Sequence, residues 1–349
     1  MPSLRPLFAL SLLLGCAGPG PNGPDPDGPE PDPAPGPAGE LVFDDSVMHT
    51  IELEVAEEDL ASLDPAIETR VPARFTFDGM TQENIGVRLK GDNGSLEPLS
   101  GKPGFSVKFD EFTEDQEFNG LKKLIMNSEV QDRSFVSRRV GYQIWRRAGL
   151  VARRTSYAVV SLNGELYGVY TLEEAVNKQF LKSYFTDPSG NLFEGSGTDI
   201  TNVERLQLKT NEEENDRTDL AELKAVLDGT PDAGLMSALA AHVDLDAFFT
   251  YWAVEELLYH YDGYTVTMIG RDCCSPNNYY VYDEPGRGFV FIPHGIDQLM
   301  RDVSYDVRQP PSERARLVAR LFPLPEAKAR LAQEITRILD TAWDAEALK

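Results

Sequence analysis

Residues 279–292 read YYVYDEPGRGFVFI, and this stretch predicts a β-hairpin. Its arms, Tyr279–Tyr282 and Phe289–Ile292, are short runs of aromatic and β-branched residues, which are typical of strands. Pro285-Gly286 supplies the turn between them. The pattern therefore places a pair of strands in a half of the chain that otherwise reads as mainly helical.

Helices are predicted on both sides of this hairpin. Asp244 can cap a helix that ends near Asp262-Gly263. The apolar residues of this helix fall on one side: Leu245, Phe248, Phe249, Trp252, Ala253 and Leu257. Further helices are expected at Glu174–Tyr184, Thr218–Leu227 and Ser312–Leu339, the last with a break at Phe322-Pro323.

The first half of the chain reads as strands with one helix. Ile51, Leu53 and Val55 alternate with glutamates, which is the period of a half-buried strand. A helix capped by Asp132 or Ser134 is expected to end at Gly149. Other strands are expected at Phe75–Phe77, Ile85–Leu89 and Phe105–Phe109, and Asn163-Gly164 predicts a hairpin joining Tyr157–Leu162 to Leu166–Leu172.

Taken together, these elements predict an α+β body of two lobes with a cleft between them. We expect a strand-rich N-lobe at residues 40–172 and a mainly helical C-lobe at residues 173–349.

The first 39 residues predict export and a lipid anchor. Arg5 precedes an apolar run, Leu7–Leu14, that is too short to span a bilayer and fits a cleavable signal at residues 1–16. The run ends in Leu-Leu-Gly-Cys, which resembles the bacterial lipobox, so Cys16 is the candidate lipidation site; an ordinary secretory peptide with an incidental cysteine is the alternative. Residues 17–39 are rich in Pro, Gly and Asp and predict a disordered tether. The protein is expected at the cell envelope, joined to a membrane only through this anchor.

Composition narrows the classes of partner. The net charge of −24 argues against nucleic acid and favours cationic partners or divalent metal. Apart from Cys16, the chain has only the adjacent cysteines Cys273 and Cys274, which can form a disulfide with each other or be two free thiols. Three cysteines are too few for a disulfide-stabilised scaffold, so that class of protein is excluded. Four scattered histidines show no zinc spacing.

Polar residues at the ends of predicted elements mark a candidate site. Asp262 follows a helix, Asn278 opens the first arm of the hairpin and Asp297 lies beyond the second arm. Oxygen ligands of this kind suit Mg²⁺ and, through it, nucleotide phosphates; plain turns and loop caps are the alternative. The loop Gly91-x-x-Gly94-Ser95 can likewise be a phosphate loop or a simple turn.

Several segments, in order, resemble the signature of the CotH family, the atypical kinases related to spore coat protein H. They cover roughly residues 45–305: Val87-Arg88-Leu89-Lys90-Gly91, Lys102-Pro103-Gly104-Phe105-Ser106-Val107-Lys108-Phe109, Asn163-Gly164-Glu165-Leu166-Tyr167-Gly168-Val169-Tyr170, Glu174-Ala175-Val176-Asn177-Lys178, Asp262-Gly263-Tyr264, Asn277-Asn278-Tyr279-Tyr280-Val281-Tyr282 and Phe291-Ile292-Pro293-His294-Gly295-Ile296-Asp297.

The resemblance implies a diverged protein-kinase-like fold that binds ATP with Mg²⁺ or Mn²⁺ and phosphorylates coat or envelope proteins. It implies that Asp262 is the catalytic aspartate. Asn278 and Asp297 would hold the metal. Lys102 or Lys108 would face the phosphates, and Glu174 would be either a hinge residue or the partner of that lysine.

One position departs from the family pattern. Many relatives have an acid where this chain has Gly295, and Asp272 or Asp283 could supply the missing oxygen. Three hypotheses therefore follow: an active kinase on surface proteins, a binding module of the same family with little turnover, and a structural surface lipoprotein. Metal-dependent ATP binding and phosphate transfer distinguish them.

Overall fold

The computed structural model describes residues 38–63, 69–91, 94–266, 275–344 and 346. Several sequence predictions therefore lie outside the described residues: the signal peptide, Cys16, nearly all of the tether, Asp272, Cys273 and Cys274. Residues 37–349 form one compact unit.

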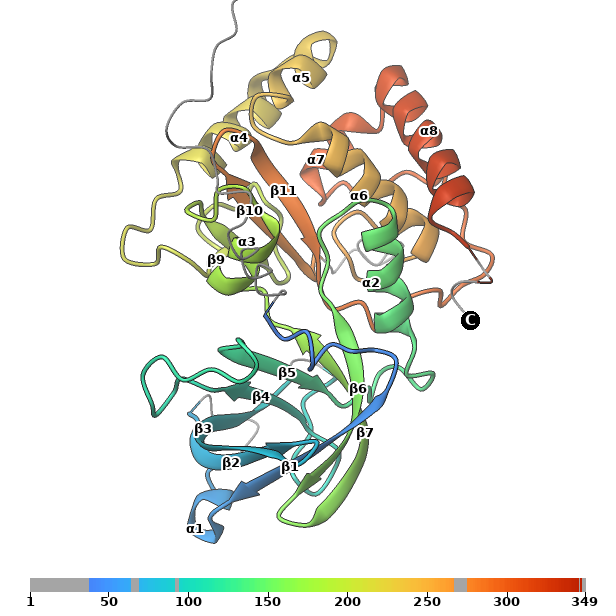
Figure 1. The fold of residues 1–349 in the computed structure, drawn as a ribbon. Helices are drawn as coiled ribbons and strands as arrows, with labels where there is room; N and C mark the ends of the chain where they lie inside the picture. The colour runs from blue at the N-terminus through green and yellow to red at the C-terminus, as the bar shows by residue number, and fades with distance from the viewer. Residues whose placement is uncertain (1–37, 64–68, 92–93, 267–274, 345, 347–349) are drawn as a thin grey trace, which may run out of the picture. The chain divides into compact units, whose positions relative to one another are not determined.

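The first seven strands form a closed barrel (Figure 1). Around the barrel they follow the order β1-β2-β3-β4-β5-β7-β6, in which β1 and β6 pair in parallel and the other neighbours are antiparallel. The strands are β1 (Met48–Val55), β2 (Val71–Phe77), β3 (Met80–Lys90), β4 (Gly104–Lys108), β5 (Lys123–Asn127), β6 (Thr155–Leu162) and β7 (Glu165–Glu174).

Alternating side chains fill the barrel interior. In β1 every second residue is buried, as its alternation with glutamates predicts. Phe75 and Phe77 of β2 meet Phe109 and Phe118 in a cluster of aromatic rings whose centroids lie 5.1 to 6.4 Å apart. Each such fully buried ring contributes about 1.5–3 kcal/mol over an exposed one.

This barrel contradicts the predicted two-lobed, kinase-like fold. The strands expected to form an open N-lobe instead form a closed barrel, because β1 pairs in parallel with β6. This pairing begins at Met48 and Tyr157. Periodicity shows which face of a strand is buried, but it cannot show that the first and sixth strands share an edge. Among the helices of residues 173–349 lies a second sheet, of which only the hairpin was predicted.

The second sheet has four strands in the order β11-β10-β8-β9, all antiparallel. The predicted hairpin is confirmed as β10 and β11, and both faces of this pair are buried. Tyr279 and Phe291 belong to one core cluster, whereas Tyr280 and Ile292 belong to another that includes α3. Burial on both faces explains the unbroken apolar arms. The strands are β8 (Leu192–Gly195), β9 (Gln207–Leu208), β10 (Tyr279–Glu284) and β11 (Gly288–Pro293).

Eight helices lie in the described part of the chain. They are α1 (Glu57–Leu60), α2 (Ser137–Arg147), α3 (Lys178–Tyr184), α4 (Thr218–Gly229), α5 (Asp232–Leu239), α6 (Leu245–Leu258), α7 (Arg316–Leu321) and α8 (Pro325–Thr341). The predicted cap Asp244 and the predicted break near Phe322-Pro323 are both confirmed.

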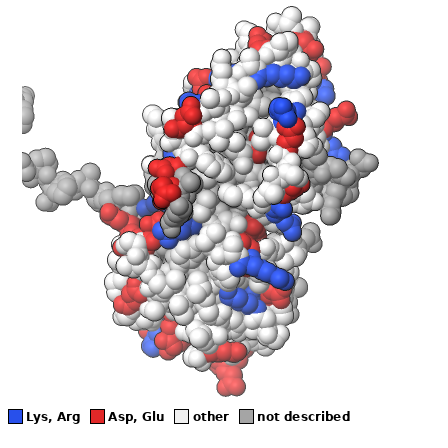
Figure 2. Space-filling model, turned by 90° about the vertical axis from the view of Figure 1, so that its right-hand side faces the viewer, with Lys and Arg blue, Asp and Glu red and all other residues white. Residues whose placement is uncertain are grey.

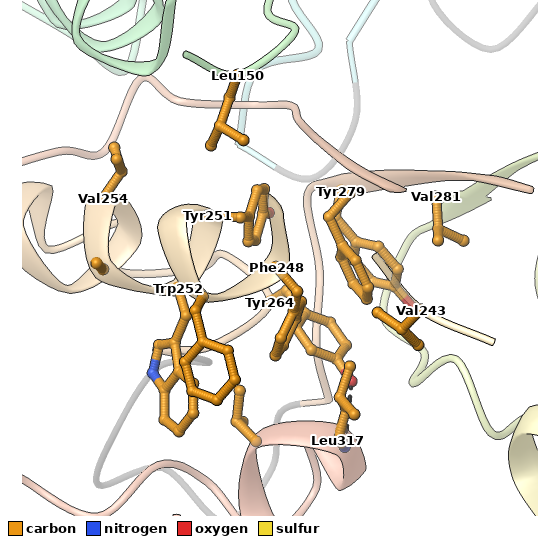
Figure 3. Packing of buried hydrophobic residues seen from close by; sticks show 14 of the residues in the cluster. Leu150, Val243, Phe248, Tyr251, Trp252, Val254, Tyr264, Tyr279, Val281 and Leu317 are labelled. Carbon is orange, nitrogen blue, oxygen red and sulfur yellow. Dashed lines mark hydrogen bonds between the residues drawn. The ribbon is translucent and has the colours of Figure 1, made fainter. Parts of the chain in front are cut away.

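Helix α6 is the centre of the largest core cluster (Figure 3). Phe248 and Tyr251 of α6 face Tyr264 and the ring of Phe291 from β11. Tyr279 of β10 packs on Tyr264 with a centroid separation of 4.8 Å. Helix α2 belongs to this cluster although it lies between barrel strands in the sequence, so neither half of the sequence corresponds to one core.

Within the described residues, no helix is both long and apolar enough to cross a bilayer. On the face shown in Figure 2, basic and acidic side chains are scattered among uncharged ones and form no broad basic patch. The expectation that this protein does not bind nucleic acid stays a prediction.

Glu256 is a buried acid on α6 whose side chain faces the segment that follows β11. Its carboxylate accepts hydrogen bonds from Trp252 Nε1 at 3.0 Å and from the hydroxyl of Tyr305. Burial raises the pKa of Glu256 to about 7, although both hydrogen bonds lower it. The protonated form is therefore favoured in the folded protein between the unfolded pKa and about pH 7.

We predict that the Glu256→Gln variant becomes more stable relative to the wild type as the pH rises. Because the folded pKa is raised, the stability from the protonated acid is fully present below the unfolded pKa of 4.5 and is lost as the pH rises through about 7. The difference should grow by up to about 3 kcal/mol over this interval. Urea unfolding at several pH values measures it, with the exposed Glu222→Gln on α4 as control; parallel pH curves for wild type and Glu256→Gln would contradict the assignment.

Candidate functional site

Asp262, Asn278 and Asp297 come from three separate segments and converge. Asp262 lies four residues after α6, Asn278 directly precedes β10, and Asp297 lies four residues after β11. The Asp262 carboxylate accepts a hydrogen bond from the Asn278 side chain and lies close enough to feel the charge of Asp297. The rigid helix and the doubly buried hairpin thus present three oxygen-bearing side chains at one place.

Asp262 is a buried carboxylate whose Oδ1 lies 3.8 Å from His260 Nε2. It is 6% exposed, and its Oδ1 has no hydrogen-bond partner among the described residues. Burial raises its pKa, the neighbouring His260 lowers it and the charge of Asp297 raises it, so that the pKa lies above the usual value. A buried acid near a second acid is the arrangement in which catalytic carboxylates are found.

Arg138 of α2 joins three acids from three other parts of the chain. Its guanidinium lies 3.0 Å from Glu129 Oε1, 2.6 Å from Glu173 Oε1 and 3.0 Å from Asp297 Oδ2. Arg153 pairs with the other oxygen of Glu173 at 2.7 Å. Burial raises the pKa of Glu173, but the charges of the two arginines outweigh this effect and lower the pKa to about 2. This acid therefore stays ionised.

Lys90, at the end of β3, belongs to the same neighbourhood. Its Nζ donates to Asn127 Oδ1 at 2.6 Å. Burial lowers the pKa of Lys90 to about 8, while the charges of Glu173 and Asp297 act to raise it. Lys90, Asn127, Arg138 and Asp297 line a small polar pocket together with the backbone of Gly91.

A larger cavity of about 690 Å³ adjoins this polar pocket. The two share Gln131 and Asp297. The larger cavity has an apolar lining from Val136, Val140, Leu299 and Met300, with Arg133 and Arg301 also present. The larger cavity is in the size range of small-molecule sites, whereas the Lys90 pocket beside it has a volume of only about 10 Å³.

The predicted lysines and Glu174 make other contacts than Lys90 does. Lys102 donates to the carbonyl of Val169 at 2.6 Å and lies over the rings of Phe135 and Tyr170. Lys108 pairs with Glu111 at 2.8 Å and is 42% exposed.

Glu174 pairs with Arg154 at 2.5 Å and accepts from Tyr184, whereas the preceding residue, Glu173, carries the link to Arg138. Among the described residues, no contact joins Lys108 or Glu174 to the Asp262 group, and their predicted roles stay predictions.

Asp283, a candidate replacement for the acid absent at Gly295, lies elsewhere. It is on β10, and burial together with a hydrogen bond to Asp219 raises its pKa to about 7. Asp216 adds to the shift. Asp283 therefore interacts with acids near α4, whereas Asp272 lies outside the described residues.

Gly295 has a packing reason of its own. Its φ is +55°, and a Cβ at this position would lie 2.3 Å from Asn278 Oδ1. No side chain fits there while Asn278 keeps its position beside Asp262. The glycine thus leaves room for a residue of the candidate site.

Sequence reasoning missed Lys90, Glu129, Glu173 and Arg153 as members of this site. Lys90 and Glu173 are charged residues at the ends of strands, which was the available signal, whereas Glu129 and Arg153 lie outside the strands and offered none. Glu173 lies in the stretch TLEE at the end of β7, and in a strand only one of two adjacent glutamates can face a given side. Choosing between Glu173 and Glu174 requires the register of β7 against β5 and β6, which is not readable from one sequence.

Within the described residues there is no group of three or more His, Cys, Asp or Glu side chains arranged to hold a metal ion. A metal at Asp262, Asn278 and Asp297 would therefore depend on two carboxylates and an amide oxygen. Mg²⁺ commonly binds to one or two carboxylates and completes its shell with water and substrate phosphates. The donor set fits Mg²⁺ or Mn²⁺ accompanied by a nucleotide.

Comparison with known protein families matches residues 87–349 to the family described as CotH kinase protein. The match covers most of the chain, so the protein belongs to the CotH family, and the resemblance predicted from the sequence is confirmed. The chain is also 24% identical over 200 residues to inner spore coat protein H of Bacillus subtilis (strain 168). That alignment covers 53% of this chain and 52% of the relative, so the chain spans about half the length of that curated protein.

We predict that Gly295→Asp, which introduces the acid that the family pattern predicts at this position, destabilises this protein and does not strengthen the site. The new side chain would collide with Asn278, lowering the free energy of unfolding by on the order of 1–3 kcal/mol. Thermal unfolding measures the effect. Gly286→Asp is a matched control, because Gly286 also has a positive φ but has open space around it. Equal losses for the two variants would show that Asn278 is not crowded by residue 295.

Proposed function

We propose that this protein is a phosphotransferase that moves the terminal phosphate of ATP to Ser or Thr hydroxyls of envelope or coat proteins. One observation carries the proposal: Asp262, Asn278 and Asp297 converge beside a pocket that holds Lys90. Membership of the family described as CotH kinase protein supports it.

In this proposal the base and sugar of the nucleotide occupy the larger, mainly apolar cavity, and the Lys90 pocket beside it, about 10 Å³ in volume, has to open to admit the phosphates. Lys90 is the cation that we assign to the phosphates, in preference to Lys102 and Lys108, because it shares a pocket with Asp297. Asn278 and Asp297 would hold Mg²⁺ or Mn²⁺, which when bound would neutralise charge on the β- and γ-phosphates. Arg138 fixes the orientation of Asp297 through their 3.0 Å ion pair.

Asp262 acts as the base. The Asp262 carboxylate would take the proton of the acceptor hydroxyl as the hydroxyl oxygen forms a bond to the γ-phosphorus. The bond between the γ-phosphorus and the bridging oxygen breaks, and ADP leaves with the electron pair. Deep burial of Asp262 excludes bulk water, which would otherwise compete with the protein hydroxyl for phosphate.

A second candidate function is a nucleotide-binding module with little turnover. It is favoured by the commitment of Asp297 Oδ2 to Arg138, which leaves that acid fewer lone pairs for metal. A module of this kind would bind ATP in the presence of metal and transfer no phosphate. A purely structural lipoprotein would do neither.

We also propose that the protein is exported and held at the cell envelope by a lipid on Cys16, with residues 17–39 as a tether. The support is the charged and apolar pattern of residues 1–16 and the composition that follows. The phosphate acceptor would then be another protein of the envelope or coat.

We predict that Asp262→Asn abolishes phosphate transfer while ATP binding is retained. Asparagine keeps the shape of the side chain and its contact with Asn278, but it cannot take a proton. Incorporation of label from γ-labelled ATP into a generic acceptor protein, with Mg²⁺ or Mn²⁺, measures transfer. The exposed Asp340→Asn on α8 is the control. Undiminished transfer by the Asp262→Asn variant would refute the role of Asp262 as the base. If the wild type binds ATP but transfers no label, the binding module is favoured.

We predict that ATP affinity falls as the pH rises above about 8, because Lys90 loses its proton there. Because the pKa of Lys90 is lowered, its positive charge is present below about pH 8 and is lost above it. The affinity for ATP should then fall by at most about tenfold per pH unit. Lys90→Met should bind weakly and show no such fall. Lys108→Met, by contrast, should resemble wild type; a loss of affinity in Lys108→Met alone would return the phosphate role to Lys108.

A further inference from the structure

Two cations on the outer face of the barrel lack an acid partner in the described part of the chain. They are Arg88 of β3 and Lys123 of β5, and both are half-buried. Both point away from the barrel interior, which is filled by their strand neighbours Val87, Leu89 and Leu124. Arg88 donates to the carbonyl of Leu89 at 3.2 Å, but neither Arg88 nor Lys123 forms an ion pair with another described residue.

Arg70 brings a third positive charge to the same face. Its side chain is only 9% exposed and crosses β3 at Gly86, where a Cβ would lie 3.1 Å from Arg70 Cδ. The guanidinium of Arg70 donates to the carbonyl of Ser106 and, at 3.0 Å, to its hydroxyl. Ser106 lies directly opposite Arg88 in the β3–β4 pair, so the two guanidinium groups are neighbours. Glu111 lies 3.8 Å from Arg70 and offsets part of its charge.

Two lysines add to the positive charge around Lys123. Lys108 lies directly opposite Lys123 in the β4–β5 pair, and Lys209, just after β9, is close enough for its charge to act on Lys123. Each of these two lysines has an acid, since Glu111 lies 2.8 Å from Lys108 and Glu194 lies 2.7 Å from Lys209. Like charges directly opposite each other destabilise a strand pair, and among the described residues no acid pairs with Lys123 to offset that cost.

The protein thus holds like charges together where partial burial strengthens their repulsion. Burial and, after it, the positive charges of four neighbours lower the pKa of Lys123 to about 8: Arg70, Arg88, Lys209 and Arg153. Lys123 therefore still carries its charge at pH 7. Because a chain of net charge −24 is rich in acids that could offset these cations, the unmatched charges of Arg88 and Lys123 indicate an anionic ligand.

We propose that Arg88 and Lys123 form a binding site for a dianionic phosphate group. A phosphate monoester carries about −1.5 to −2 charges at pH 7, which matches the two cations, whereas a single carboxylate would match only one of them. The planar guanidinium of Arg88 can donate two parallel N–H bonds to phosphate oxygens, and the ammonium of Lys123 supplies a point charge.

This site is distinct from the Lys90 pocket. Neither Arg88 nor Lys123 lines that pocket or the larger cavity beside it. The charged groups near Lys90 include two acids, Glu173 and Asp297, whereas those that act on Lys123 are cations. Phosphate binding by Arg88 and Lys123 therefore does not depend on the proposed transfer reaction.

Titration with inorganic phosphate at pH 7 tests the site directly. In the full-length protein labelled with ¹³C-lysine, the Lys123 side-chain signal is identified by its loss in Lys123→Met and should shift saturably as phosphate is added. The signal of the adjacent Lys122, which pairs with Asp115 at 2.9 Å, should stay in place. Arg88→Gln should raise the dissociation constant read from the Lys123 signal by about tenfold or more.

Two further titrations separate the sources of the phosphate and the two pockets. O-phosphoserine that binds more tightly than inorganic phosphate would assign the site to phosphorylated protein segments, and equal or weaker binding would assign it to free phosphate. Lys90→Met should leave the Lys123 titration unchanged. An unshifted Lys123 signal, an unchanged dissociation constant in Arg88→Gln, or an equal loss of affinity in Lys90→Met and Arg88→Gln would each overturn the proposal.

The cost of the unmatched charges gives a second measurement. Without phosphate, Lys123→Met should raise the midpoint of thermal unfolding by on the order of 1–2 °C, because it removes repulsion between cations. Lys122→Met is the matched control and should leave the midpoint equal or lower, because it breaks ion pairs with Asp115 and Asp110. Added phosphate should raise the midpoint of the wild type and not that of Lys123→Met. A lower midpoint for Lys123→Met than for the wild type in the absence of phosphate would show that the Lys123 charge is already matched, and the proposal would fail.

Discussion

The candidate site depends on the three ion pairs that Arg138 forms. This single side chain of α2 contacts Glu173 of the barrel strand β7, Glu129 of the segment after β5, and Asp297 of the loop after β11. Removing one partner of a buried, hydrogen-bonded pair typically costs about 3–5 kcal/mol, because the remaining charge has no substitute for water. The loop that carries Asp297 is thus tied to the barrel by charge and not only by packing.

The rest of the site is arranged around that fixed loop. The hairpin β10–β11, apolar on both faces, carries Asn278 at its start and leads to Asp297 at its end. Helix α6 ends just before His260 and Asp262, and its Glu255 reaches forward to hold the imidazole. Packing forces therefore place the backbone, and a balanced set of buried charges places the functional groups. Two glycines, Gly263 and Gly295, provide the space in which those groups meet.

Much of the local structure could be predicted from the sequence. The alternation in β1, the apolar arms of the hairpin, the Asp244 cap and the Asn163-Gly164 turn all depend on neighbouring residues, and each was confirmed. The two-lobed fold was wrong because barrel closure depends on pairing between β1 and β6, which no local pattern encodes.

The site shows the same division. Asp262, Asn278 and Asp297 were predicted from their places at the ends of elements, and the structure brings them together. Lys90 and Glu173 could not be selected in advance, because their importance comes from register: Lys90 reaches Asn127, and Glu173 pairs with Arg138 while Glu174 pairs with Arg154. The meaning of Gly295 depends on the distance to a residue seventeen positions earlier, and only the fold contains that distance.

The parallel pairing of β1 with β6 also constrains the order in which the chain can fold. β1 can pair with β2 as soon as both have been synthesised, but its second edge must wait for β6, since Met48 meets Tyr157. Contacts between such distant positions slow folding, and an open strand edge invites pairing with other chains. Glu52 and Glu54, exposed on β1, place negative charge along that waiting edge and repel a second copy of the same strand. Charged side chains on a strand with an open edge disfavour its pairing with other chains, so the consequence of this topology falls on β1 in the interval before β6 is made.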